Sequence, residues 1–114
     1  MKAKRTATRW RPVFQGGLIL PWLRDLEGRN GCYLLRLPGG PVEYVGRSTT
    51  GRLRKTLMRH FYGWKGDTAG HTVTKRHEAR AIMTTKDDAA ELERELIRRH
   101  SPDGNKRGQE VIPF

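Results

Sequence analysis

Two short runs rich in apolar residues lie near the middle of the chain, separated by four turn-forming residues. The runs are CYLLRL, at residues 32–37, and VEYVG, at residues 42–46. Tyrosine, leucine and valine dominate them, and these residues are common in strands. The intervening PGGP is typical of a tight turn. The pattern therefore predicts a β-hairpin over residues 31–48.

The length of the turn sets the expected register of this hairpin. If Leu37 pairs with Val42, Tyr33 and Tyr44 lie on a diagonal between the two strands. Aromatic side chains can reach across such a diagonal, a separation of roughly 7–8 Å. The two phenols can therefore share a site. Packing is the alternative interpretation, because tyrosine is a common strand residue.

The segment after the hairpin has the spacing of an amphipathic helix. In GRLRKTLMRHF, residues 51–61, Leu53, Leu57 and Phe61 recur every four residues and form one apolar stripe. The next stretch, residues 63–71, is rich in glycine and charged residues, which predicts a loop.

A third strand is predicted at EARAIMTT, residues 78–85, with Ala79, Ala81 and Met83 on one side. A short helix is expected before the hairpin, because Pro21 is followed by WLRDLEG and a glycine-containing turn.

The last predicted helix begins at a capping box formed by Thr85 and Asp88 and ends before Pro102. From the hairpin onward the element order is β-β-α-β-α. This order indicates an α+β fold, a small three-stranded antiparallel sheet flanked by helices.

Length and charge narrow the class of protein. The 114 residues suit one compact domain, residues 31–114, preceded by an arm and short helix, residues 1–30. Lysine and arginine number 23 against 12 acidic residues, a net charge of +11. This surplus predicts an acidic polymer as partner. No stretch approaches the roughly 20 apolar residues that span a bilayer, and no secretion signal is recognisable, so we expect a cytoplasmic protein.

The N-terminal segment, residues 1–15, is predicted to be a mobile basic arm with Trp10 placed between Arg9 and Arg11. It either grips phosphates or has no role. Cys32 is the only cysteine, so no intramolecular disulfide and no cysteine-based zinc site can form. We expect Cys32 in the core.

One carboxylate of the last helix has unusual neighbours. The residues one turn before and after Glu93 are Ala89, Ala90, Leu96 and Ile97, all apolar. A carboxylate in such surroundings is costly unless a cation or strong donors meet it. An arginine and a metal ion would both satisfy this need. Glu91 and Glu95, in contrast, have charged neighbours and are expected to be solvated.

Four motifs in this order make the chain resemble the GIY-YIG nuclease family. The two hairpin tripeptides that name the family stand here as GCY, residues 31–33, and YVG, residues 44–46. The third motif runs from the second tripeptide through Ser48 and the helix to His60. The fourth is ELIRRHSPDGN, which begins two residues after Glu93.

This resemblance covers roughly residues 31–105 and implies a metal-dependent nuclease that hydrolyses phosphodiester bonds by in-line attack of water. It implies that Tyr33, as a phenolate or through Tyr44 or His60, takes the proton from water, which requires a lowered pKa. It also implies that Glu93 holds a single divalent ion. An oxygen ligand with waters suits magnesium or manganese.

The catalytic arginine of the family is where this sequence departs from the pattern. The spacing of the helix leucines places that arginine at Thr56, whereas counting from Tyr44 reaches Arg54. We expect Arg52 to supply the charge, because it lies on the same helical face as Thr56 and His60. In the alternative interpretation, Arg52, Lys55 and Arg59 form only a solvated or DNA-contacting stripe.

The remaining candidates have binding or structural interpretations. The resemblance implies structural roles for Gly46 and Asn105, the latter closing the last loop. Three histidines lack ligand spacing and are expected at surface or capping positions: His71, His77 and His100. The residues expected to contact nucleic acid are Arg47, Arg54, Lys55 and Arg59.

The sequence thus predicts an endonuclease that acts on nucleic acid, DNA above all. One alternative is a binding module that keeps the fold but does not cut, because Thr56 replaces the family arginine. Another is a basic structural protein of a ribonucleoprotein, which leaves Tyr33, Tyr44 and Glu93 unexplained. Duplex, branched and single-stranded substrates all agree with the sequence.

Overall fold

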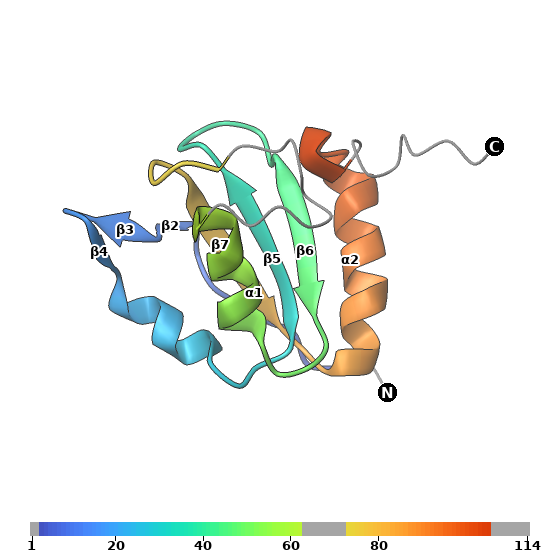
Figure 1. The fold of residues 1–114 in the computed structure, drawn as a ribbon. Helices are drawn as coiled ribbons and strands as arrows, with labels where there is room; N and C mark the ends of the chain where they lie inside the picture. The colour runs from blue at the N-terminus through green and yellow to red at the C-terminus, as the bar shows by residue number, and fades with distance from the viewer. Residues whose placement is uncertain (1–2, 63–72, 106–114) are drawn as a thin grey trace.

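A twisted antiparallel sheet with a helix on each face forms the centre of the protein (Figure 1). The computed structural model describes residues 3–62 and 73–105. The main strands are β5 (Gly31–Arg36), β6 (Tyr44–Ser48) and β7 (Glu78–Met83), and β5 lies between the other two. The predicted α+β class and its three antiparallel strands are confirmed.

The hairpin has the predicted register. Tyr33 pairs with Gly46, and Leu35 pairs with Tyr44. On its other side β5 pairs with β7, which places Tyr33 opposite Ala81. Tyr33 therefore lies in the middle of the sheet, between two residues with little or no side chain.

The alternation of side chains along β5 separates two cores. Tyr33 and Leu35 face α1 (Leu53–Arg59), and Cys32 and Leu34 face α2 (Lys86–His100). The first core also contains Leu53, Leu57, Ala79, Ala81 and Met83. The second also contains Val45, Ile82, Leu92 and Leu96. The two helices therefore cover opposite faces of the sheet, and Cys32 is buried as expected.

The helix ends agree with their sequence signals, with one difference in α1. Thr85 caps α2 by accepting a hydrogen bond from the Asp88 N–H, and the helix ends at His100. The predicted helix over residues 51–61 is shorter in the structure. Its α-helical part is α1, and the 3₁₀ turn η2 (His60–Tyr62) follows it directly. The short helix before the hairpin is a 3₁₀ helix, η1 (Pro21–Leu26).

The prediction of a mobile N-terminal arm is wrong for its described residues. β1 (Thr6–Ala7) and β2 (Arg11–Pro12) both pair with β7 and extend the sheet to five strands. The physical reason is that the outer edge of β7 carries backbone groups that need partners, and the arm supplies them.

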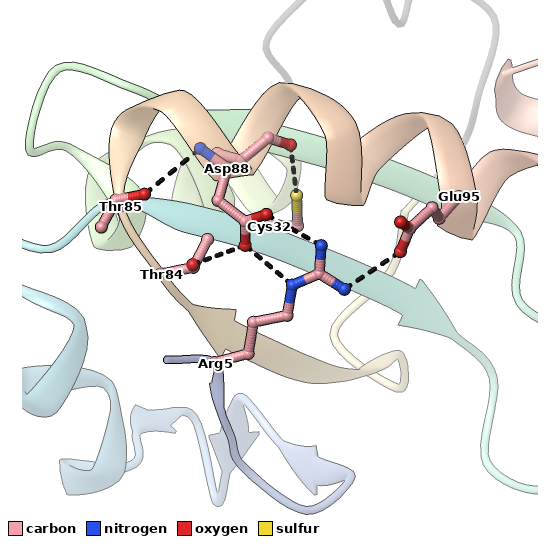
Figure 2. Close-up of polar contacts among 7 residues, drawn as sticks. Arg5, Cys32, Thr84, Thr85, Asp88 and Glu95 are labelled. Atoms are coloured by element: carbon pink, nitrogen blue, oxygen red, sulfur yellow. Dashed lines mark hydrogen bonds and ion pairs between the residues drawn. The ribbon is translucent and has the colours of Figure 1, made fainter. Parts of the chain in front are cut away.

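Arg5 fixes the beginning of this arm to α2. Its guanidinium group lies between the carboxylates of Asp88 and Glu95 (Figure 2). Trp10 packs beside the second core, and the Arg36 guanidinium lies 4.0 Å from its ring centre. The aromatic residue of the predicted basic arm therefore has an arginine against its ring.

A two-stranded hairpin, β3 (Phe14–Gln15) and β4 (Leu18–Ile19), follows the arm and projects from the sheet (Figure 1). Gly16 and Gly17 form its turn with φ angles of 60° and 81°, a conformation that favours glycine. Within the described ranges, none of the helices has the length and apolar character required to span a bilayer.

Candidate active site

Tyr33 is almost fully buried at the centre of the sheet, with 1% of its surface exposed. Its ring lies over Gly46 of the neighbouring strand. A Cβ atom at position 46 would overlap the Tyr33 ring and its hydroxyl group. Gly46 is therefore required for the position of Tyr33, which gives the predicted structural role of this glycine a specific cause.

Three aromatic side chains meet on the α1 face of the sheet. The Tyr33 hydroxyl lies 2.7 Å from Nε2 of His60, which α1 and η2 hold in a buried position. The ring centre of Tyr44 lies 6.1 Å from that of Tyr33 and 4.7 Å from that of His60. The structure thus brings together the two hairpin tyrosines and the histidine, as the sequence predicted.

The surroundings of Tyr33 favour the protonated phenol. Burial raises the pKa of Tyr33 well above its usual value, and the nearby Tyr44 and Glu93 raise it further. Proton removal by a phenolate requires a lowered pKa, so the protein alone shifts this group in the opposite direction. The Tyr33 hydroxyl and Nε2 of His60 share a hydrogen bond whose donor depends on the tautomer of the histidine.

Glu93 lies on the other side of the sheet, where α2 packs beside β6. Its side chain is 23% exposed, whereas Glu91 and Glu95 belong to the exposed surface of the helix. Burial raises the pKa of Glu93, and the positive charges of Arg47 and Arg94 act against that shift. The predicted difference between Glu93 and its two acidic neighbours is confirmed.

Among the described residues, Arg47 is the cation that pairs with Glu93, with 3.7 Å between Nε and Oε1. This distance is long for a charge-assisted hydrogen bond. Arg47 follows the hairpin glycine and was expected to contact phosphate or solvent; its side chain is 44% exposed. In the part of the chain that the structure describes, no three ligating side chains gather to hold a metal ion.

The charge of Glu93 reaches residues on both faces of the sheet. It raises the pKa of Tyr33 on the α1 face, and it adds to the burial that raises the pKa of Cys32 to about 12 on the α2 face. Tyr33 and Glu93 are therefore electrostatically coupled although they belong to opposite faces.

Asn105 holds the outer edge of β6. Its side-chain oxygen accepts a hydrogen bond from the Val45 N–H at 2.7 Å, and its amide nitrogen donates to the Val45 carbonyl at 2.8 Å. The Gly104 N–H donates to the carbonyl of Glu43. The last loop is thus fixed beside Tyr44, which agrees with the predicted structural role of Asn105.

The arginine predicted to act in catalysis does not lie in the helix. Arg52 is the N-cap of α1, with φ −121° and ψ 33°, and its N–H donates to the Ser48 hydroxyl. The assumption that its side chain shares a helical face with Thr56 and His60 is therefore wrong, because Arg52 lacks helical geometry.

Arg52 instead lines a groove of about 360 Å³ beside α1, together with Arg54, Lys55 and Tyr62. None of the residues that line it belongs to the tyrosine–histidine cluster. Arg59 lies further along α1 and is half-buried.

Two of the three histidines without ligand spacing are described. His100 belongs to the exposed surface of α2. The partial burial of its ring, together with the nearby Arg99 and Arg80, lowers its pKa. His77 is buried, so of the two positions expected for it, surface or capping, the surface position is wrong. Its Nδ1 accepts a hydrogen bond from the Thr74 N–H, and its Nε2 lies 2.9 Å from a Glu43 carboxylate oxygen. Glu43 is distant in sequence, so no local signal could reveal this pair. His71 lies outside the described residues.

Comparison with known proteins gives a partial match. The chain is 33% identical over 89 residues, 75% of its length, to UvrABC system protein C of an Anaeromyxobacter species, strain Fw109-5. It is 32% identical over the same length to UvrABC system protein C of Anaeromyxobacter dehalogenans. In both cases the match spans 12% of the relative. No family model matches the chain.

Proposed function

The chain belongs to the GIY-YIG nuclease family, and from this premise we propose that it is a metal-dependent endonuclease that hydrolyses phosphodiester bonds, with DNA as its substrate. One observation carries the proposal: the buried Tyr33 contacts His60 and Tyr44 and is coupled electrostatically to the half-buried Glu93. This combination of groups has no evident use in a purely structural sheet.

GIY-YIG nucleases typically use a divalent metal ion, and the surroundings of Glu93 fit such a group. The carboxylate is half-buried, its pKa is raised, and its nearest cation is at 3.7 Å, so its negative charge is incompletely compensated. One carboxylate with waters is a ligand set that magnesium and manganese accept. When bound there, the ion would lower the pKa of nearby groups and offset charge on the phosphate.

The chain's own residues would move the proton. We take the tautomer of His60 in which Nε2 carries no proton, so that the protonated Tyr33 phenol donates to it. The Tyr33 oxygen would then accept the proton of an attacking water while its own proton passes to Nε2 of His60. Tyr44 packs against both partners and keeps the rings in place. This relay avoids a free phenolate in a buried site.

An arginine would offset the charge that develops on the phosphoryl oxygens. We propose Arg47 for this role, because it is half-exposed and next to Glu93. Arg52, the residue expected from the sequence, is the alternative. It lines the groove beside α1, so it would have to reach the phosphate from that side.

A nicking assay on plasmid and on branched, duplex and single-stranded oligonucleotides tests the proposal, with magnesium, manganese or chelator. We expect cleavage with metal only. Tyr33→Phe should lower the rate by on the order of 100- to 10,000-fold. Tyr62→Phe is the matched control, since it removes a phenol hydroxyl outside the cluster. Cleavage in chelator, or an undiminished rate in Tyr33→Phe, would contradict the mechanism.

A second candidate function is a nucleic-acid-binding module that keeps the fold without cutting. The observation that favours it is Thr56, which stands where the family pattern has its catalytic arginine. Tight binding without cleavage in every metal would support this candidate over the endonuclease. Thr56→Arg, which restores the family residue, should then produce activity.

A further inference from the structure

We propose that the groove beside α1 binds one unpaired nucleotide of the substrate, with its phosphate among the basic side chains and its base stacked on Tyr62. This rests on the proposed function, because it takes the ligand to be nucleic acid. The groove proposal adds a class of substrate to that function, namely a strand with unpaired bases next to the cleavage site. Residues just after η1, at the beginning of α1 and at Tyr62 line the groove. Figure 1 shows η1 and α1 side by side.

The charge of the groove suits a phosphate. Among the described residues that line it, Arg52, Arg54 and Lys55 are cationic and Glu27 alone is acidic. Glu27 is 73% exposed and lies 3.9 Å from Arg54 Nη1, so it compensates little of this charge. Three cations against one weakly placed anion leave a positive groove, as expected for a site that follows a nucleic-acid backbone.

One donor in the groove lacks a partner. Nε of Arg54 is buried and makes no hydrogen bond within the described residues. A buried donor without a partner is unfavourable, and native structures contain few of them. The Arg54 side chain as a whole is 38% exposed, so a turn of its guanidinium group toward the groove would bring Nε to a phosphate oxygen. This observation is independent of the charge count.

Tyr62 provides the surface on which a base can stack. It is 66% exposed at the edge of the groove, which is unusual for an aromatic side chain that packing alone would favour. The same 3₁₀ turn, η2, carries the buried His60, which contacts Tyr33. A single turn of chain therefore presents one aromatic ring to the catalytic cluster and another to the groove.

The rest of the lining and the size of the groove favour an unpaired nucleotide over a duplex. Ile19 and Met58 add apolar surface below Tyr62, and Ile19 is 37% exposed. The volume of about 360 Å³ suits a single nucleotide-sized ligand. A stacking side chain needs a free base face, which paired bases inside a duplex do not offer.

Binding measured in chelator tests the groove without cleavage. Fluorescence anisotropy would compare a labelled single strand of about 12 nucleotides, within the usual site size, with a duplex of the same sequence. We expect Tyr62→Ala to weaken binding of the single strand by about 10-fold, the loss of one stacked base, and to change duplex binding by less than about 2-fold. Tyr62→Phe, which keeps the ring, should bind like the wild type.

The charge of the groove has its own test. Arg54→Ala should weaken single-strand binding and reduce the slope of log affinity against log salt by about 0.7, the value for one phosphate contact. Arg98→Ala removes the same charge from the exposed surface of α2 and is the matched control. Thermal unfolding would confirm that each variant is folded.

The outcomes separate the groove from the nuclease proposal. If Tyr62→Ala and Arg54→Ala bind the single strand as tightly as the wild type, the groove proposal is wrong even if the protein cleaves DNA. Equal losses on single strand and duplex would also overturn it. If both variants show the selective defect while no metal supports cleavage, the groove stands and the proposed hydrolysis fails.

Discussion

Two arginines, Arg5 and Arg47, contact carboxylates of helix α2 with different geometry. Arg5 donates to both oxygens of Asp88, at 2.7 and 2.9 Å, and to Glu95 at 3.0 Å (Figure 2). The Thr84 hydroxyl donates to the same Asp88 carboxylate at 2.7 Å. Arg47, on the other hand, approaches Glu93 only to 3.7 Å.

The difference separates a structural carboxylate from one that is available for chemistry. At Asp88, Arg5 and the Thr84 hydroxyl donate hydrogen bonds directly to the carboxylate oxygens. This contact joins the N-terminal arm to the helix. At Glu93, burial is only partly offset by Arg47 and the pKa is raised. Both contacts join an arginine to a carboxylate, so the distance and the remaining lone pairs distinguish them, not the kind of charge.

The largest effect that we expect from altering one of these carboxylates is on the cleavage rate. Glu93→Gln should lower the cleavage rate by on the order of 1,000-fold, because the amide cannot replace a charged oxygen ligand. Glu95→Gln, two residues along the helix, should leave the rate nearly unchanged. Single-turnover cleavage with saturating magnesium measures both. Equal rates in the two variants would mean that Glu93 is only a salt-bridge partner.

The second effect concerns the arginine. Arg47→Ala should lower the cleavage rate by on the order of 100-fold, as for loss of one group that stabilises transition-state charge. Arg52→Ala should lower it less and should act mainly through substrate affinity. Rate at saturating substrate and affinity in chelator separate the two roles. The reverse order of effects would favour Arg52 as the catalytic arginine.

The third effect is on stability. Arg5→Ala should lower the free energy of unfolding by about 1 kcal/mol, a modest value because the Arg5 side chain is 35% exposed and solvent screens the pair. Cleavage per folded molecule should not change. Urea denaturation measures the loss, with Arg9→Ala as the control for an exposed arginine of the same arm. A matching loss in Arg9→Ala would show that Arg5 is not the anchor.

The smallest effect is the pH dependence of stability without metal. The pKa of Glu93 is raised in the folded protein above its ordinary value of 4.5, so the folded state holds this proton more tightly. The free energy of unfolding should therefore fall as pH rises from about 4.5 through the folded pKa, and Glu93→Gln should abolish this part of the fall. Denaturation at several pH values in chelator measures it. Glu91→Gln, which alters an exposed carboxylate of α2, should retain the wild-type profile.

Local patterns were sufficient for the main elements of the fold. The turn length fixed the register of the hairpin, and the capping residues Thr85 and Asp88 fixed the start of α2. The apolar neighbours of Glu93 identified the half-buried carboxylate of the helix. In each case, residues close in sequence determine the geometry.

Contacts between distant segments could not be predicted in this way. The arm pairs with β7 across more than half of the chain, and His77 finds Glu43 in another loop. The prediction for Arg52 was wrong for a different reason. Its spacing fits the helix, but the helix begins one residue later, and the side chain of the cap points to the groove.

The hydrogen bonds of Asn105 also bear on how the protein behaves when it is concentrated. An edge strand offers unpaired N–H and C=O groups that can pair with the sheet of another molecule. In β6 the amide of Asn105 occupies both groups of Val45, and the Gly104 N–H occupies the carbonyl of Glu43. Removing this amide would expose a short edge beside Tyr44 to strand addition and self-association. The side chain that fixes the edge of the site therefore also keeps neighbouring molecules from joining their sheets.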